Sequence, residues 1–254
     1  MREEMQQTRE RTFLRIGAVC AVLGAIVSVA AGTGFGNVTN ELGTEAVLRY
    51  VSSQPTWYWP TVYLGFILGA LLWVGAFVAL SGSLTQGAGW ALGRLGAASV
   101  VVGATVHVID SSISGVGLAR LADAWASASE QASFLHEGDM LLWVLGGTWA
   151  GVLGLFHGLP FVLFGLAVVL DRSYPSWLGW LGFAGGLGSL LIGTMMFLGL
   201  ELVPEWLFIV FALVVSVFML ILGALMWRHA NAARNGEPTP GREEQMPNRS
   251  EARS

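Results

Sequence analysis

Long intervals without charge are the feature that most constrains this chain. A helix needs about 20 apolar residues, at about 1.5 Å each, to cross about 30 Å of hydrocarbon. Five intervals between charged residues each hold such a stretch, and one further apolar stretch includes Arg94 and Asp110 near its ends, so the sequence predicts six membrane-spanning helices. The expected spans are residues 16–34, 60–80 and 92–111, one within 139–171, then 177–199 and 206–227.

The composition agrees with a bilayer as the main solvent. Hydrophobic residues make up 54% of the chain and charged residues 12%, against roughly 45–50% and about 25% in soluble domains. The expected fold class is therefore all-α, a polytopic membrane helix bundle. From composition alone, the lipid bilayer is the one partner that we expect.

Several function classes are excluded by residues that are missing. The chain has no lysine, because all 13 cationic residues are Arg, so a lysine Schiff base is impossible. Cys20 is the single cysteine, which excludes an internal disulfide and a CxxC pair. There is no phosphate-loop motif, no HExxH helix and no basic stripe for nucleic acid. We therefore expect no nucleic-acid partner and no cofactor with a recognisable motif.

The arginines predict the orientation in the membrane, because positively charged flanks stay on the cytoplasmic side. With the N-terminus inside, only Arg49 and Arg120 lie outside. The prediction is a multi-pass cell-membrane protein with both termini cytoplasmic. A competing interpretation is a signal peptide cleaved after Ser28-Val29-Ala30.

The chain divides into three parts by composition. Residues 1–12 are expected to be a cytoplasmic N-terminal segment, 13–228 the transmembrane domain, and 229–254 a disordered cytoplasmic tail. Apolar residues at helical spacing predict two short external amphipathic helices, at about 44–54 and 115–128. These helices either cap the bundle at the membrane surface or form a lid.

Glycine and proline predict how the spans pack. The 34 glycines often occur in small-xxx-small pairs, which let helix backbones approach closely. The fifth span has more such pairs than one neighbour needs, which suggests a homo-oligomer as an alternative to a compact single bundle. Pro160 removes the hydrogen bond to the Phe156 carbonyl and should kink the fourth span. Aromatic residues at 57–59, 177, 206 and 227 are expected to lie at the interfaces.

Three ionisable residues inside the spans form the candidate site. His107 and Asp110 share a face of the third span, and His157 lies in the fourth. Such residues are costly in a membrane and indicate function: a metal site, a proton relay or one side of a haem pocket. The alternative is a packed histidine bonded to a backbone carbonyl, with Asp110 at the outer interface.

Depth determines whether the two histidines can meet. Counted from Arg94 and Asp171, His107 and His157 lie roughly 20 and 21 Å along their helices. Counted from the outer charges Asp110 and Asp139, they lie roughly 5 and 27 Å away. The conflict arises because the fourth interval is too long for one span, so that helix either projects outward or tilts and bends.

A second group, His136-Glu137-x-Asp139, precedes the fourth span. It is expected to be solvated, with a divalent-ion site shared with Asp110 as the alternative. The missing CxxCH motif excludes c-type haem. A b-type haem would need level histidines on facing helices.

Three segments resemble a group of bacterial six-helix membrane proteins known as a domain of unknown function. The segments are Trp57-Tyr58-Trp59, Asp110 to Trp125 with Leu121-Ala122-Asp123-Ala124-Trp125, and Tyr174-Pro175-Ser176-Trp177-Leu178-Gly179. The resemblance covers most of residues 13–227 and implies the six-helix architecture. It implies no catalytic residues, and Ser111 departs from the Gly that many relatives have after the aspartate.

Three functions follow from these features. The first is a non-enzymatic helper, sensor or structural membrane component. The second is a small-solute or ion transporter with a polar site at His107, Asp110 and His157. The third is a haem- or metal-dependent redox enzyme, and the sparse intramembrane chemistry favours the first.

Overall fold

A computed structural model describes residues 2–34, 43–84, 87–171, 173–200 and 205–235, and these ranges contain helices and no strands. The six predicted spans are confirmed. Six helices are long and apolar enough to cross a membrane, so this is a multi-pass integral membrane protein whose outer surface contacts lipid. The spans are Thr8–Thr33, Tyr58–Ser83, Gly87–Ser127, Ala132–Asp171, Ser176–Phe197 and Leu207–Ala232.

The terminal helices are longer than the sequence pattern suggested. Helix α1 runs from Arg2 to Thr33, so residues 2–12 are helical and continuous with the first span, which begins at Thr8. Helix α9 runs from Glu205 to Asn235, so residues 229–235 are helical and do not belong to a tail. The rest of the expected tail, residues 236–254, lies outside the described residues.

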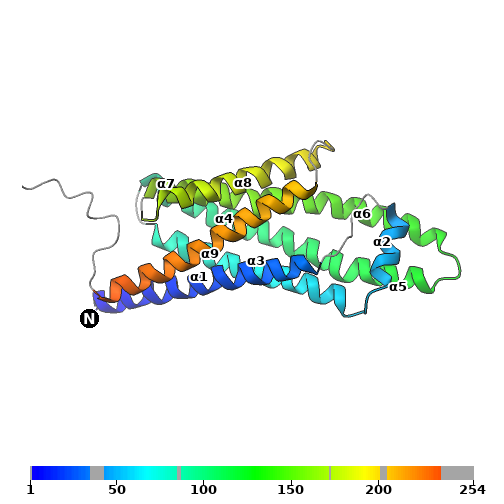
Figure 1. Cartoon of the computed structure of the whole chain (residues 1–254), viewed down its shortest axis with the longest axis horizontal. Coiled ribbons are helices and arrows are strands. Elements are labelled where there is room, and N and C mark those ends of the chain that lie inside the picture. Colours follow the sequence, from blue (N-terminus) through cyan, green and yellow to red (C-terminus); the bar gives the residue numbers. More distant parts are fainter. Residues whose placement is uncertain (1, 35–42, 85–86, 172, 201–204, 236–254) are drawn as a thin grey trace, which may run out of the picture.

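The spanning helices pack in a closed sequence, each against its neighbours along the chain (Figure 1). Helix α1 packs against α3 (Tyr58–Ser83), and α3 against α4 (Gly87–Ser112). The fourth span contacts α4 on one side and α8 (Ser176–Phe197) on the other. Helix α9 lies against both α8 and α1, which closes the ring. The start of α1 and the end of α9, here called the chain ends, therefore lie at one end of the bundle.

The third and fourth spans project beyond the others as a helical hairpin. Helix α4 continues without a break through the π-helix η2 (Ile113–Leu118) into α5 (Ala119–Ser127). The return arm is α6 (Ala132–Val152), the π-helix η3 (Leu153–Gly158) and α7 (Leu159–Asp171). The arms have 41 and 40 residues, about 60 Å each, which is twice the hydrocarbon thickness. The long fourth interval therefore reflects outward projection.

We call the projecting part the headpiece: α2 (Gly43–Ser52), α5 and the first turns of α6. Helix α2 lies across the hairpin, where Val47, Leu48 and Val51 are buried against Leu118 and its neighbours. Residues 113–127 thus end the third span and do not form a separate surface helix. Trp59, expected at the lipid interface, is only 4% exposed, because it belongs to this headpiece core and donates its indole N–H to the Val51 carbonyl.

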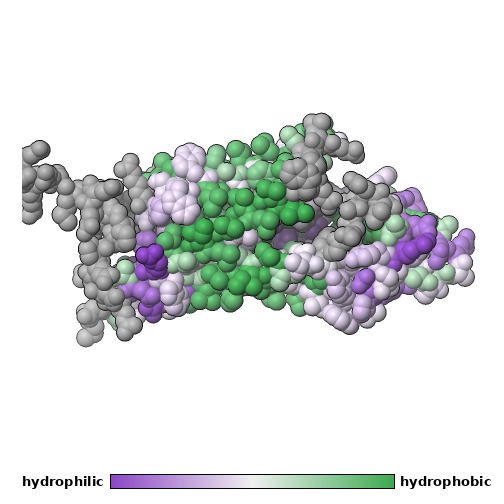
Figure 2. Space-filling view, viewed as in Figure 1, coloured by the Kyte–Doolittle hydropathy of each residue, from purple (hydrophilic) through white to green (hydrophobic). Residues whose placement is uncertain are grey.

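On the face shown in Figure 2, an apolar band lies between two more polar ends. Trp57, Trp177 and Trp227 are exposed, as an interfacial belt requires. Trp143 of α6 is the most exposed of the large hydrophobic residues at 76%, and it was not among the expected interface residues. The headpiece and the chain ends lie outside this band.

The glycines of α8 lie against neighbours within the chain. Gly179 approaches Gly165 of α7, Gly182 approaches Phe218 of α9, and Gly193 approaches Ala150 of α6. The surplus of small residues on this span, which suggested an oligomer, is thus matched by contacts on several sides inside one bundle.

The approach of α4 to η3 offers a direct test of glycine packing. A Cβ on Gly103 would meet the backbone of Leu155 and Phe156, whereas a Cβ on Gly147 meets nothing within 4 Å. We expect Gly103→Ala to lower unfolding stability by about 1–3 kcal/mol, since the backbones must separate. Thermal unfolding in detergent measures this effect, with Gly147→Ala as the matched control. Equal stability of the two variants would contradict the close approach.

Candidate functional site

The rings of His107 and His157 contact each other across α4 and η3. Their centroids lie 6.0 Å apart and the ring planes are nearly perpendicular, at 88°. The depth count from Arg94 and Asp171 is therefore correct. The count from the outer charges is wrong because both helices continue into the headpiece.

The histidine pair lies near the middle of the bundle. Trp73, in the middle third of α3, has its ring 5.7 Å from that of His157, and Phe66 has its ring 6.1 Å from that of His107. His107 is 4% exposed. His157 is half-buried even at this depth.

Both helices carry a π-helical turn beside the pair. His157 lies in η3, three residues before Pro160, whose missing N–H leaves the Phe156 carbonyl without its usual helical donor. A wider turn accommodates this defect without breaking the helix. The second π-turn, η2, begins directly after Ser112. Such turns often occur at functional sites.

Asp110 is buried and accepts a hydrogen bond from Thr148. The two oxygens lie 2.6 Å apart, and Asp110 is 4% exposed. The expectation that this residue lies at the outer interface is wrong, because the helix continues beyond it through η2 and α5. Thr148 was not predicted. Apart from the tryptophans, however, Thr148 and His157 are the two residues with a polar side chain in the run 140–170.

Buried polar side chains continue from the pair toward the headpiece. We call His157, His107, Asp110, Ser111 and Ser114 the polar line. Its last four members recur at helical spacing on the buried side of α4 and η2. The hydroxyls of Tyr63 and Ser114 form a hydrogen bond at the headpiece end. The line thus crosses the outer part of the bundle and ends under the headpiece.

Three atoms of the polar line lack a protein partner. Among the described residues, Nδ1 of His107, Nδ1 of His157 and Oγ of Ser111 are buried without a hydrogen bond. Buried polar atoms without protein partners are uncommon and generally bind water, ions or protons. Three members of the polar line therefore each have one atom that could bind a water molecule.

On the side facing the chain ends, the pair meets a layer of aromatic rings. We call Trp73, Phe77, Phe156, Phe161 and Phe164 the aromatic layer. Trp73 stacks on Phe156 at 5.7 Å, and Phe77 stacks on Phe164 at 4.5 Å. His107 stacks on Phe156 at 5.0 Å, with an angle of 12° between the planes. The polar line ends at this layer.

The second expected group does not join the site. His136, Glu137 and Asp139 are exposed, and Asp139 accepts a hydrogen bond from Thr44 of α2. Thr148, which holds Asp110, lies about 13 Å further along the helix axis from Asp139. No group of three His, Cys, Asp or Glu residues in the described part of the chain could hold a metal ion. The shared divalent-ion site is therefore not formed.

A polar cluster at the opposite end was missed by the sequence analysis. The ring of Tyr174 lies 4.8 Å from that of His229, and its hydroxyl lies 3.3 Å from Oγ of Ser83. Burial raises the pKa of Tyr174 to about 12, so the phenol stays neutral. The cluster ties the loop after α7 to α3 and α9.

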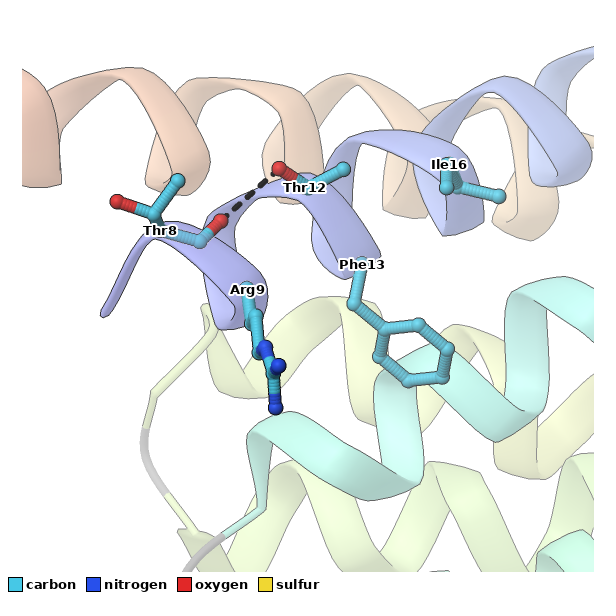
Figure 3. Close-up of a pocket in the computed structure, with 5 residues that line it drawn as sticks. All are labelled: Thr8, Arg9, Thr12, Phe13 and Ile16. Atoms are coloured by element: carbon cyan, nitrogen blue, oxygen red, sulfur yellow. Dashed lines mark hydrogen bonds between the residues drawn. The ribbon is translucent and has the colours of Figure 1, made fainter. Parts of the chain in front are cut away.

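A shallow surface depression lies elsewhere, on α1 (Figure 3). It has a volume of about 260 Å³ and is lined by Thr8, Arg9, Thr12, Phe13 and Ile16. Thr12 donates to the Thr8 carbonyl at 2.9 Å, within the same helix. The depression shares no residue with the polar line.

The bond between Thr148 and Asp110 has a measurable consequence. We expect Thr148→Val to lower unfolding stability by about 1–3 kcal/mol, because the buried carboxyl loses a donor. Thr105→Val is the matched control, since Thr105 is exposed and bonds only to the Val101 carbonyl of its own helix. Thermal unfolding of both variants in one detergent gives the comparison. A Thr148→Val protein as stable as the control would show that this bond contributes little.

Comparisons with known proteins give no further guide to the site. No family model matches the chain, and neither the curated proteins nor the solved structures searched contain a match. The chemistry of the site is therefore argued from its own residues.

Proposed function

We propose that this protein is a non-enzymatic membrane transporter that takes up protons at the His107–His157 pair. The observation that carries the proposal is the contact of the two rings, 6.0 Å apart, near the middle of the membrane. Imidazole is the side chain whose ordinary pKa lies in the physiological range. Ionisable residues at this depth commonly belong to ion or proton pathways.

The residues around the pair favour a proton over a metal ion or a haem. Asp110 is engaged by Thr148, which leaves two imidazoles as nearby ligands. Aromatic rings of Phe156 and Trp73 pack directly against the two histidines. A proton needs neither a full ligand set nor the room that a porphyrin needs.

A second candidate is the helper, sensor or structural component favoured by the sequence. The supporting observation is the dense aromatic packing. The ring centroid of Trp73 lies within 5.7 Å of the ring centroids of Phe156, His157 and Phe161. In that case the histidines fix the packing of α4 against η3. The resemblance to bacterial six-helix proteins, which stays a prediction, is compatible with both candidates.

Proton uptake into vesicles tests the first candidate against the second. In reconstituted vesicles containing a pH-sensitive dye, we expect His157→Ala to abolish uptake driven by an ion or solute gradient. His136→Ala, which alters an exposed headpiece histidine, should leave uptake unchanged. The absence of uptake in wild type, or equal uptake in wild type and His157→Ala, would contradict the proposal. A Soret band or stoichiometric metal in the same sample would instead favour the redox enzyme.

We further propose that both termini are cytoplasmic and that the headpiece lies outside the cell membrane. The arginine distribution supports this orientation, since Arg49 and Arg120 belong to the headpiece and the other arginines of the sequence do not. A homo-oligomer is not needed to explain the small residues of α8, because those residues pack against helices of the same chain.

Reporter fusions test the orientation. A fluorescent protein that folds only in the cytoplasm should fluoresce when fused after Ser254, and alkaline phosphatase at the same place should be inactive. Insertion of either reporter between Ala128 and Gln131, at the tip of the hairpin, should give the opposite result. The reverse pattern at both positions would contradict the proposed orientation.

A further inference from the structure

We propose that the polar line is a one-sided entry path, which admits water and protons to His157 from the headpiece side and is closed by the aromatic layer on the other. This inference rests on the proposed proton uptake, to which it adds the route and the side of entry.

The first step in the argument is the continuity of the line. His107, Asp110, Ser111 and Ser114 recur at helical spacing and are all buried. Asp110 reaches across to Thr148 of α6, and His107 contacts His157 of η3. Polar groups therefore follow one another from Ser114 to the middle of the bundle without an intervening layer of hydrocarbon.

The second step is the state of the polar atoms. Nδ1 of His107, Nδ1 of His157 and Oγ of Ser111 lack protein partners among the described residues. Each needs a hydrogen-bonding partner small enough to enter a packed interior, and water meets that requirement. These atoms lie on both sides of the bonded pair Asp110 and Thr148 along the line.

The third step is the access to the deep end of the line. His157 and Thr148 are half-buried, as are Trp149 and Phe208, whose rings lie 5.2 Å apart. Phe208 also lies 6.0 Å from the ring of His157. The side of His157 that faces α9 is thus less tightly covered than His107. Figure 2 shows a hollowed, polar-coloured area where the apolar band meets the headpiece end.

The fourth step is closure toward the chain ends. Beyond the pair, Trp73, Phe161 and Phe77 follow one another with ring centroids 5.4 and 5.0 Å apart. Phe77 and Phe161 are 0% exposed and Trp73 is 1% exposed. The next polar group in that direction, the Oγ of Ser81, is buried and has no partner within the described residues. The aromatic layer thus separates the polar line from the chain ends, so the proposed path enters from the headpiece side.

Silver ions test this path, because Ag⁺ is small, does not cross lipid readily and blocks thiols. The test uses the full chain with Cys20→Ala, so that an introduced cysteine is the single thiol. Thr148→Cys places that thiol on the path, and Ser114→Cys places it nearer the headpiece should the first variant not fold. After silver treatment of sealed, oriented vesicles, the protein is denatured and the remaining thiol is labelled with a maleimide.

We expect Thr148→Cys and Ser114→Cys to lose the free thiol when silver is added on the headpiece side and to keep it when silver is added on the other side. Ser189→Cys is the matched control, because Ser189 is 0% exposed, lacks a partner and lies on α8 outside the line. It should stay free from both sides. Ser83→Cys, beyond the aromatic layer, should react only from the side of the chain ends.

Three outcomes would overturn the inference: protection of both path thiols, reaction from both sides, or reaction no faster than that of Ser189→Cys. The result is separable from the uptake experiment. One-sided silver access without proton uptake would support the entry path and contradict the transporter proposal. Proton uptake that depends on His157 but without silver access would contradict this route.

Discussion

The close approach of α4 to η3 is the contact on which the site depends. Gly103 has no side chain, and the backbone of Leu155 and Phe156 occupies the place that a Cβ would take. His107 follows one helical turn after Gly103, on the same face of α4, and therefore meets the turn that carries His157. With lipid outside, helix association depends on such packing and on hydrogen bonds between helices. The contact between the two histidines thus depends on the close approach of the third and fourth spans at Gly103.

The spans and the fold class could be predicted from the sequence because the bilayer imposes a length and a polarity on each helix. The helix ends were harder, since nothing in an apolar pattern says how far a helix continues into water. Residues 113–127 illustrate this point, because their amphipathic spacing suited a separate surface helix but they continue α4 through η2. Trp59 is a second case: an aromatic residue at a span entry usually faces lipid, but here α2 covers it.

The members of the candidate site were partly predictable. His107, Asp110 and His157 stood out because ionisable residues are rare inside spans. Their mutual placement was not predictable, because it depends on how far both arms of the hairpin project. Thr148 was overlooked because the hydroxyl of a single threonine costs little energy in a membrane helix, where it can donate to a backbone carbonyl of the same helix. In the structure it also donates to Asp110, a contact between residues 38 positions apart that no local pattern encodes.

The two π-turns and the aromatic layer give the bundle its asymmetry. The polar line lies on the headpiece side of the histidine pair, and rings such as Trp73, Phe77 and Phe164 lie on the other side. A proton on the polar side would face a dry, apolar barrier until the rings moved. That arrangement suits a site that is loaded from one side.

The most direct measurement is solid-state NMR of the histidine rings in bilayers, with ¹³C,¹⁵N-labelled histidine and His107→Gln and His157→Gln variants for assignment. We expect a through-space correlation between the two rings, and a change of the imidazole ¹⁵N shifts of the pair when the outside pH is lowered. A bilayer sample without the correlation would contradict the contact itself. A correlation between the rings with ¹⁵N shifts that do not change with pH would support the contact and contradict proton binding.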